Sequence, residues 1–309
     1  MCPQRTEIRV SPYNPRIGNA VLLRVQVIRV VLVSWLSVCA TNVGAAENDS
    51  GPPTPETNIA KHAFTFDLQY ADVSGYVQVR EFDVDGTRLA LDDLGIDHAL
   101  VVALGYEQRL SDVSSLRFRL RWFDESGQGS FPEDIAFNGG IYQAGATLTS
   151  TAQLADFVFH WQRDLLRFGD GGHFQGLVGA NFTYLNFTID GPQVSSSDKS
   201  EAFYRQALPI PSLGLRVDYP IHNKGTFYAE IFGFAVNNWN SLRKEGGTVT
   251  LSQDNAEANI GVRYRLGRRW HLDGGLRYDY LKIDEQSNED GNVFLQRSWG
   301  PFIGFAAHF

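Results

Sequence analysis

The chain has 309 residues, of which 43% are hydrophobic and 13% aromatic, and it carries a net charge of −8. Its mean hydropathy of −0.22 argues against a bundle of membrane-spanning helices. No stretch after residue 46 approaches the roughly 18 consecutive apolar residues that one such helix needs. The acidic balance gives no support to nucleic-acid binding, which requires a basic surface.

The first 46 residues are organised like a secretory signal peptide. Five arginines and a single acid lie in residues 1–29, an apolar run occupies residues 30–40, and small residues follow at Ala45 and Ala46. This order of basic, apolar and small residues predicts export and removal of residues 1–46. Removal takes away the five arginines and one glutamate, which leaves a net charge of −12.

Both cysteines of the chain, Cys2 and Cys39, lie in this segment, so the exported protein is expected to form no disulfide. Cys39 also allows a lipoprotein interpretation, but Val38 stands where a small residue is expected before a lipidated cysteine. Residues 47–61 are polar and rich in proline, which predicts a flexible periplasmic leader.

From residue 62 onward, apolar and polar residues alternate with a period of two. In residues 116–122 one parity is apolar and the other is arginine: Leu116, Phe118, Leu120 and Trp122 against Arg117, Arg119 and Arg121. A helix would spread the arginines around its axis, whereas a strand places them on one side. The same alternation recurs in ten segments, at about 68–80, 97–109, 114–124, 150–163, 173–189, 208–220, 225–237, 255–267, 269–283 and 295–309.

The connections between these segments alternate strictly in length. Short ones follow the second, fourth, sixth and eighth segments, and long polar ones follow the others, over 81–96, 125–149, 190–207, 238–254 and 284–294. Short periplasmic turns and long extracellular loops are typical of outer-membrane barrels. We therefore predict an all-β fold: a transmembrane antiparallel up-and-down β-barrel of about ten strands over residues 62–309. Eight or twelve strands remain alternatives.

The aromatic residues fit two membrane-interface belts, which barrels carry at both edges of their apolar band. Tryptophans fall on the apolar parity, and the predicted interface set is Trp122, Trp161, Trp239, Trp270, Trp299 and Phe309.

The last segment ends Ile303-Gly-Phe-Ala-Ala-His-Phe309, with apolar residues at alternate positions and an aromatic residue last. In this segment the sequence resembles the bacterial outer-membrane β-barrel superfamily. The resemblance covers residues 62–309 as a pattern and the last strand as a motif. It implies location in the bacterial outer membrane. It also implies that Gly304, Ala307 and Phe309 form a signal read by the barrel assembly machinery, and that outer-membrane lipids and lipopolysaccharide surround the barrel.

Charged residues on the polar parity are expected to line the lumen. They are Glu107, Arg117, Arg119, Arg121, Asp156, Arg216, Asp218, Glu230, Arg263, Arg265, Asp273, Arg277 and Asp279. Buried charges must be paired, so one interpretation is a salt-bridged lumen that holds a structural barrel rigid. The alternative is a narrow channel for ions or small polar solutes, with the three arginines of residues 116–122 favouring anions.

Two other function classes stay open as alternatives. A surface-binding or adhesin-type barrel would act through its long loops. An outer-membrane enzyme needs a base beside a nucleophile or an activated water, and at the outer rim the sequence offers only His98, beside Asp97, Asp92 and Asp93. We therefore expect that the protein is not an enzyme.

The acidic loops predict neither a metal site nor another cofactor. Residues 83–86 lack the third acid and the distal glutamate of a calcium-binding loop. The sequence does not indicate an oligomeric state.

Overall fold

The computed structural model describes residues 61–81, 84–169, 171–195, 203–206, 209–240, 249–288 and 290–309. The predicted signal peptide (1–46) and leader (47–61) lie outside these residues, apart from Lys61. None of the described residues belongs to a helix long and apolar enough to cross a bilayer.

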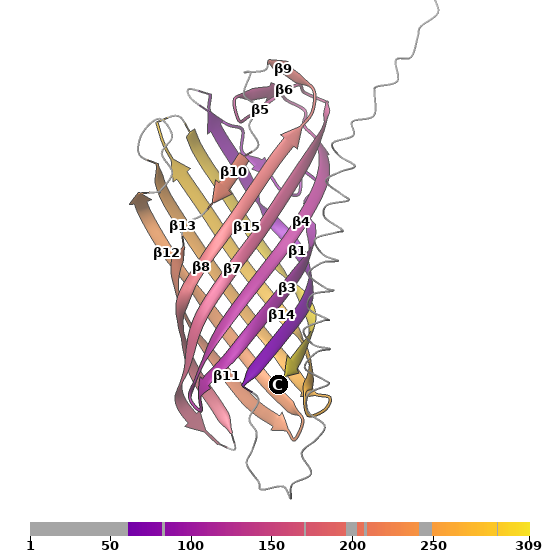
Figure 1. Ribbon diagram of the computed structural model, residues 1–309. Helices are drawn as coiled ribbons and strands as arrows, with labels where there is room; N and C mark the ends of the chain where they lie inside the picture. The colour runs from indigo at the N-terminus through magenta and orange to yellow at the C-terminus, as the bar shows by residue number, and fades with distance from the viewer. Residues whose placement is uncertain are drawn as a thin grey trace, which may run out of the picture. The chain divides into compact units, whose positions relative to one another are not determined.

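Ten long antiparallel strands form a closed ring (Figure 1). They are β1 (His62–Glu81), β3 (His98–Ser111), β4 (Ser114–Ser130), β7 (Thr147–Phe168), β8 (Gly172–Asp190), β11 (Ile210–His222), β12 (Gly225–Asn240), β13 (Thr250–Arg265), β14 (Trp270–Gln286) and β15 (Asp290–His308). Each pairs with the next, and β1 pairs with β15 from Ala63 opposite His308 to Glu81 opposite Asp290. The ring confirms the predicted barrel, with ten strands.

Several strands extend beyond the predicted segments. β4 continues to Ser130 and β7 begins at Thr147, because these polar residues still pair in the ladder from Glu125 opposite Ala152 to Ser130 opposite Thr147. At the other end β1 begins at His62, six residues before the predicted start. Between β4 and β7, strand pairing therefore runs past the stretch over which apolar residues alternate, whereas at the start of β1 the alternation of Phe64, Phe66 and Leu68 continues the predicted pattern.

Five short strands lie among the connections: β2 (Leu89–Ala90), β5 (Ile135–Phe137), β6 (Gly140–Tyr142), β9 (Gln193–Ser195) and β10 (Phe203–Gln206). β5, β6 and β9 form a small separate sheet at the end of the barrel that carries the long connections. We call this end the loop end. The opposite end, with its short connections and the last residue, is the turn end (Figure 1).

The outer wall of the barrel is apolar. Large side chains such as Leu100, Leu213, Ile231, Ile260 and Ile303 are each about half exposed on it. A closed barrel satisfies every backbone hydrogen bond between neighbouring strands, and an apolar exterior matches lipid. The described residues therefore form a closed antiparallel β-barrel with an apolar outer wall, the architecture predicted from the sequence.

Candidate functional site

The arginines of β4 point into the lumen and reach across it. Arg117 donates two hydrogen bonds to the carboxylate of Glu230 on β12, at 2.6 and 2.7 Å. Arg119 pairs with Glu257 on β13. Arg121 lies 2.6 Å from Asp156 Oδ2 and 3.1 Å from Glu257 Oε2. The pairs with Glu230 and Glu257 join opposite walls of the barrel, whereas Asp156 lies on the neighbouring strand β7, opposite Arg121 in the ladder.

Arg121 also pairs with Asp279 on β14. On the remaining strands, Arg216 holds both carboxylate oxygens of Asp218 at 2.7 Å and lies 3.1 Å from Glu230. Arg277 pairs with Asp67 at 2.8 Å, and Arg263 with Asp273 at 3.0 Å. We call this set of lumen ion pairs the charge network. Buried carboxylates and guanidinium groups require such pairing.

The structure brings most of the predicted lumen charges together in or beside this network. Glu107 accepts a hydrogen bond from Gln162 at 3.0 Å. The prediction that Arg265 lines the lumen is wrong. Arg265 is exposed, it is the last residue of β13, and it donates a hydrogen bond to the carbonyl of Asn223 in the neighbouring turn. Its parity is inward, but the strand ends there, so it lies at the turn-end rim.

Sequence reasoning missed two members of the network. Glu257, 2% exposed, contacts Arg119, Arg121 and Arg277. It lies one strand repeat before Asn259, on the parity already assigned to the lumen, so extending that alternation would have found it. Asp67 was missed because the first predicted strand began one residue later.

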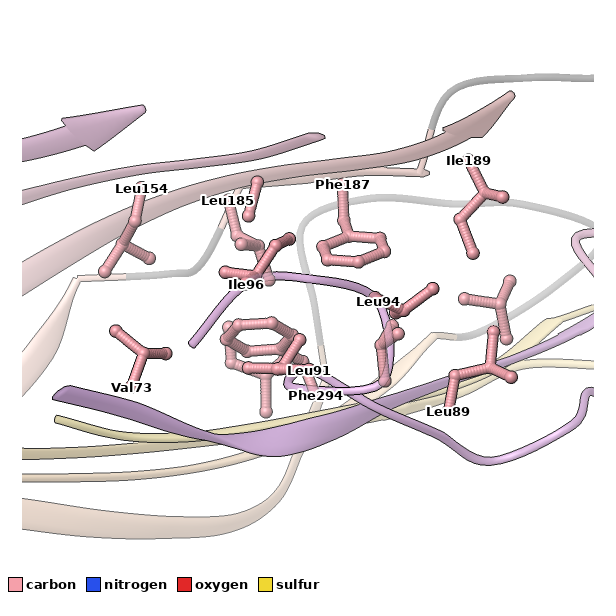
Figure 2. Close-up of a cluster of buried hydrophobic side chains, with 14 of the residues drawn as sticks. Val73, Leu89, Leu91, Leu94, Ile96, Leu154, Leu185, Phe187, Ile189 and Phe294 are labelled. Carbon is pink, nitrogen blue, oxygen red and sulfur yellow. The ribbon is translucent and has the colours of Figure 1, made fainter. Parts of the chain in front are cut away.

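The loop end of the lumen is filled by a folded segment of the chain. Residues 89–96, between β1 and β3, place Leu89, Leu91, Leu94 and Ile96 in the barrel mouth with at most 2% exposure. We call residues 89–96 the plug. Figure 2 shows these side chains facing Phe187, Phe294 and other apolar residues of the wall. The prediction of a long polar loop over residues 81–96 is therefore wrong for the plug. The plug folds inward because its leucines and isoleucine supply apolar area to bury.

The plug sits in a recess made by glycines of β4. A Cβ added to Gly127 would lie 2.3 Å from the Leu94 carbonyl oxygen, and one added to Gly129 would lie 2.1 Å from that of Asp93. Ser150 on β7 donates a hydrogen bond to the Leu94 carbonyl at 2.8 Å. The backbone of the plug thus packs directly on the barrel wall.

The small sheet β5–β6–β9 covers the plug, and we call it the cap. Thr87 N donates a hydrogen bond to the Ala136 carbonyl at 2.7 Å, which links the residues just before the plug to β5. Tyr142 of β6 donates to the Ile189 carbonyl at 3.0 Å. Burial raises the pKa of the Tyr142 hydroxyl, so it remains a donor. Phe137 packs on Phe187, with ring centroids 6.0 Å apart.

A polar cavity lies on the turn-end side of the network. A cavity of about 250 Å³ opens there, lined by Arg109, Arg216, Arg263, His173, Asp164 and other polar residues. A smaller one of about 80 Å³ lies among network residues such as Arg117 and Arg277. The lumen is therefore layered, with an apolar plug, a charge network and a polar vestibule.

The predicted interface aromatics lie on the outer wall. Trp161, Trp239, Trp270 and Trp299 are between 37% and 55% exposed, and Trp122 is half-buried. At the turn end Phe309 stacks on Phe64 at 5.5 Å. Aromatic side chains in such positions suit the edge of a bilayer.

The three residues of the predicted assembly signal lie at the turn-end part of β15 and just after it. Ala307 lies opposite Phe64 and Trp270. Gly304 lies opposite Asp67, where an added Cβ would come within 2.8 Å of the Asp67 Cβ. Gly304 therefore makes room for the Asp67 side chain that pairs with Arg277.

Among the histidines that lie beside an acidic or hydroxyl group are His98 and His160. His98 lies on the outer surface, 49% exposed, with Nδ1 3.1 Å from Asp72 and Nε2 3.7 Å from Asp97. His160 is fully buried in the lumen, and its Nε2 lies 2.8 Å from Ser212 Oγ. Its Nδ1 has no hydrogen-bond partner among the described residues. Within the part of the chain that the structure describes, no carboxylate therefore orients this His–Ser pair.

No protein-family model and no curated protein matches the chain. Among solved structures, the outer membrane protease OmpT of Escherichia coli is 12% identical, with a TM-score of 0.48; the match covers 83% of this chain and 100% of that one. Ail, the attachment invasion locus protein of Yersinia pestis, is 11% identical, with a TM-score of 0.31 and coverages of 81% and 99%. The outer membrane protein OprG of Pseudomonas aeruginosa is 14% identical, with a TM-score of 0.31 and coverages of 81% and 97%.

Proposed function

We propose that this chain is a closed, non-enzymatic outer-membrane barrel with a structural role, which holds a rigid, capped surface at its loop end. The observation that carries the proposal is the layered lumen. The four apolar side chains of the plug, Leu89, Leu91, Leu94 and Ile96, are at most 2% exposed. Below them, Arg121 bridges Asp156 and Asp279 from opposite walls. Both layers support a barrel that passes no solute, in preference to the narrow channel.

The lumen chemistry supports the non-enzymatic part of the proposal. The arginines on β4 have acidic partners from β7, β12, β13 and β14. Their charges serve cross-linking, because a paired buried charge is neutralised at the site. The exposed His98 has acidic neighbours but points outward from the wall. No serine, threonine or cysteine nucleophile contacts it within the described part of the chain.

Single-channel conductance of the folded protein in a planar bilayer tests this proposal. We expect the wild type to be silent. A variant with residues 89–96 replaced by a short Gly-Ser linker should stay silent too, because the charge network still crosses the lumen. Combining that replacement with Arg119→Ala and Arg121→Ala should produce steady conductance. Each variant must first show heat-modifiable migration on a gel, which reports a folded barrel.

Steady conductance of the wild type would contradict the proposal and restore the channel. If the variant in which only residues 89–96 are replaced conducts ions, the plug alone closes the barrel. In that case the network would have no part in the barrier.

The surface-binding alternative is favoured by one observation, the ordered cap. Two connections far apart in sequence, after β4 and after β8, together build β5–β6–β9. Replacing residues 132–145 by a Gly-Ser linker removes β5 and β6. If cells displaying this variant lose adherence that wild-type cells possess, while the barrel remains heat-modifiable, the cap carries a binding function.

A further inference from the structure

One strand of the ring continues toward the loop end without its neighbour on one side. β12 pairs with β11 only as far as Gly233, which lies opposite Leu213. Residues 234–240 of β12 continue beyond that point and pair with β13 on their other side (Figure 1). On the β11 side, no described strand pairs with residues 234–240. We call this side of residues 234–240 the open edge.

Prolines explain why the ladder between β11 and β12 ends there. Pro209 precedes β11 and Pro211 lies in it, and neither has an N–H group to donate. Hydrogen-bonding groups of successive residues in a strand point to alternate sides. Because Pro211 cannot donate, the continuous ladder with β8 uses the donors of Ile210 and Ser212. Pro211 therefore faces β12 and offers it no donor, which ends the ladder.

The same alternation shows that the N–H group of Ala235 points out of the open edge. Leu213 lies two residues after Pro211 and therefore also faces β12, where it is opposite Gly233. Gly233 thus faces β11, and so does Ala235, two residues further along β12. Since the ladder with β11 has ended at that level, the N–H and C=O groups of Ala235 meet no described strand.

A second place where a ladder ends shows how this fold covers such an edge. β3 pairs with β4 only as far as Val102 opposite Trp122. Beyond that pair, Glu125 accepts a hydrogen bond from the Leu100 N–H group at 2.9 Å, and the plug packs on Gly127. Among the described residues, no side chain and no segment covers the open edge of β12 in this way.

The exposure of Phe234 shows that the wall is open beside this edge. Phe232, Phe234 and Val236 share the inward parity of β12, and the first and last are 2% and 3% exposed. Phe234 lies between them and is 37% exposed. A recess of about 580 Å³ adjoins the edge, lined by Leu213, Ala235 and other residues of β11, β12 and β13. The wall therefore leaves room for an added strand that contacts Phe234.

The sequence of the open edge does not protect it from pairing. Exposed edge strands are commonly blunted by lysine, by other charges or by proline. Residues 234–240 read Phe-Ala-Val-Asn-Asn-Trp-Asn and contain none of these. A bulge between Val236 and Trp239, with Asn238 at a φ of 55°, ends the regular part of the edge. An added strand is therefore expected to pair over residues 234–236, next to the recess.

The surroundings of the open edge are acidic. Asp254 on β13 lies opposite Ala235 and lines the recess. Lys282 lies opposite Asp254 on β14, but no ion pair joins the two among the described residues. The exposed cations of the described loop end are Arg88 and Arg297, and its exposed acids include Asp92, Asp93, Asp97, Glu133, Asp134 and Asp190. This end of the barrel therefore attracts a cationic segment and repels an anionic one.

A second copy of the chain cannot supply the added strand. The strands of a membrane barrel tilt by roughly 35–45°. Two barrels that insert with the same end outward therefore present facing strands that cross at a large angle, and crossed strands form no ladder. An extended segment of a different partner at the loop end has no such restriction and can align with the edge.

We propose that residues 234–236 of β12 accept an extended, cationic peptide segment of a partner protein as an additional strand. Main-chain hydrogen bonds at the open edge give affinity in this mode of recognition, and the alternating side chains give specificity. Apolar side chains of the segment lie on the side of Phe234, and basic ones lie on the side of Asp254. The interaction goes beyond the closed barrel proposed above and does not depend on whether the lumen passes solutes.

Disulfide trapping in the folded protein tests the proposal. Residues 62–309 contain no cysteine, so Asn237→Cys places a single exposed reporter at the open edge. The probe is a short peptide of alternating valine and lysine with a terminal cysteine. Its control has the same sequence with an N-methyl group on every residue, which removes all N–H donors but keeps the charge.

We expect the reporter at Asn237 to trap the probe at least about tenfold faster than the N-methylated control, because several hydrogen bonds are lost together. At Ala144→Cys, an exposed position between β6 and β7, the two rates should be equal. A probe with glutamate in place of lysine should be trapped several-fold more slowly. Ala235→Pro, which removes the N–H group of the edge, should abolish the preference at Asn237→Cys, and Ala235→Val should retain it.

Three results would overturn the proposal. Equal trapping of the probe and its N-methylated control at Asn237→Cys would mean that charge alone attracts the peptide. An equal preference at Ala144→Cys would mean that the peptide does not select this edge. A preference that survives Ala235→Pro, in a barrel with heat-modifiable migration, would place the binding elsewhere. If Ala235→Pro fails to fold, the N-methyl comparison on the unaltered edge still decides.

Discussion

Glu257→Ala is expected to lower the free energy of unfolding of the barrel by about 3–5 kcal/mol, the cost of leaving buried charges without a partner. Glu257 is 2% exposed and faces three guanidinium groups, those of Arg119, Arg121 and Arg277. Removing the carboxylate leaves Arg119 with no acid in the network, while the other two retain partners. The urea midpoint in detergent, followed by heat-modifiable gel migration, measures the change.

Two further variants separate charge from shape. Glu257→Gln keeps the side-chain volume and the hydrogen bond with Asn259, so a loss close to that of alanine assigns the effect to charge. Arg265→Ala removes an exposed arginine with a single hydrogen bond to Asn223, and should change stability by no more than about 0.5 kcal/mol. A midpoint for Glu257→Ala equal to that of wild type would mean that the network contributes nothing to stability.

The barrel wall could be predicted from the sequence because the alternation of apolar and polar residues depends only on neighbouring positions in the same strand. An alternating strand that faces lipid on one side must show a period of two, as residues 116–122 do. Glu257 was missed inside the predicted segment 255–267, where its flanking outward residues are small alanines, and Asp67 was missed because the first predicted segment began at residue 68. The partners within the network were out of reach, since Arg121 meets Asp279 only through a ring of ten strands.

The plug shows a different limit of sequence reasoning. Leu89, Leu91, Leu94 and Ile96 stand among acids in a segment between two strands, and the acids Asp92 and Asp93 are exposed as expected. Whether such leucines fold inward depends on the space that distant strands leave. That space comes from Gly127 and Gly129, whose missing side chains are informative only once the neighbouring chain is known.

Gly127→Val is expected to release the plug from the barrel mouth while the ten-stranded ring stays folded. The new Cβ would lie 2.3 Å from the Leu94 carbonyl oxygen and 2.4 Å from the Gly95 carbonyl carbon. Both are backbone atoms, so the clash is relieved only by displacing the segment. The ring keeps its own ladder, because β4 still pairs with β7 on both sides of Gly127.

Cysteine labelling measures the release. Residues 62–309 contain no cysteine, so Leu94→Cys introduces a single reporter into the barrel. Leu94 is fully buried, and a maleimide should therefore label the reporter at least about tenfold faster once Gly127→Val is added. Gly267→Val is the matched control, because an added Cβ there meets nothing within 4 Å.

Equal labelling rates with and without Gly127→Val would contradict the direct seating of the plug on β4. Faster labelling accompanied by loss of heat-modifiable migration would instead mean that the plug and the wall fold as one unit. Faster labelling of a barrel that remains folded would show that the wall folds independently of the plug. Burial of a few leucines, each contributing about 1.5–3 kcal/mol, would then close the mouth of a wall that is stable without them.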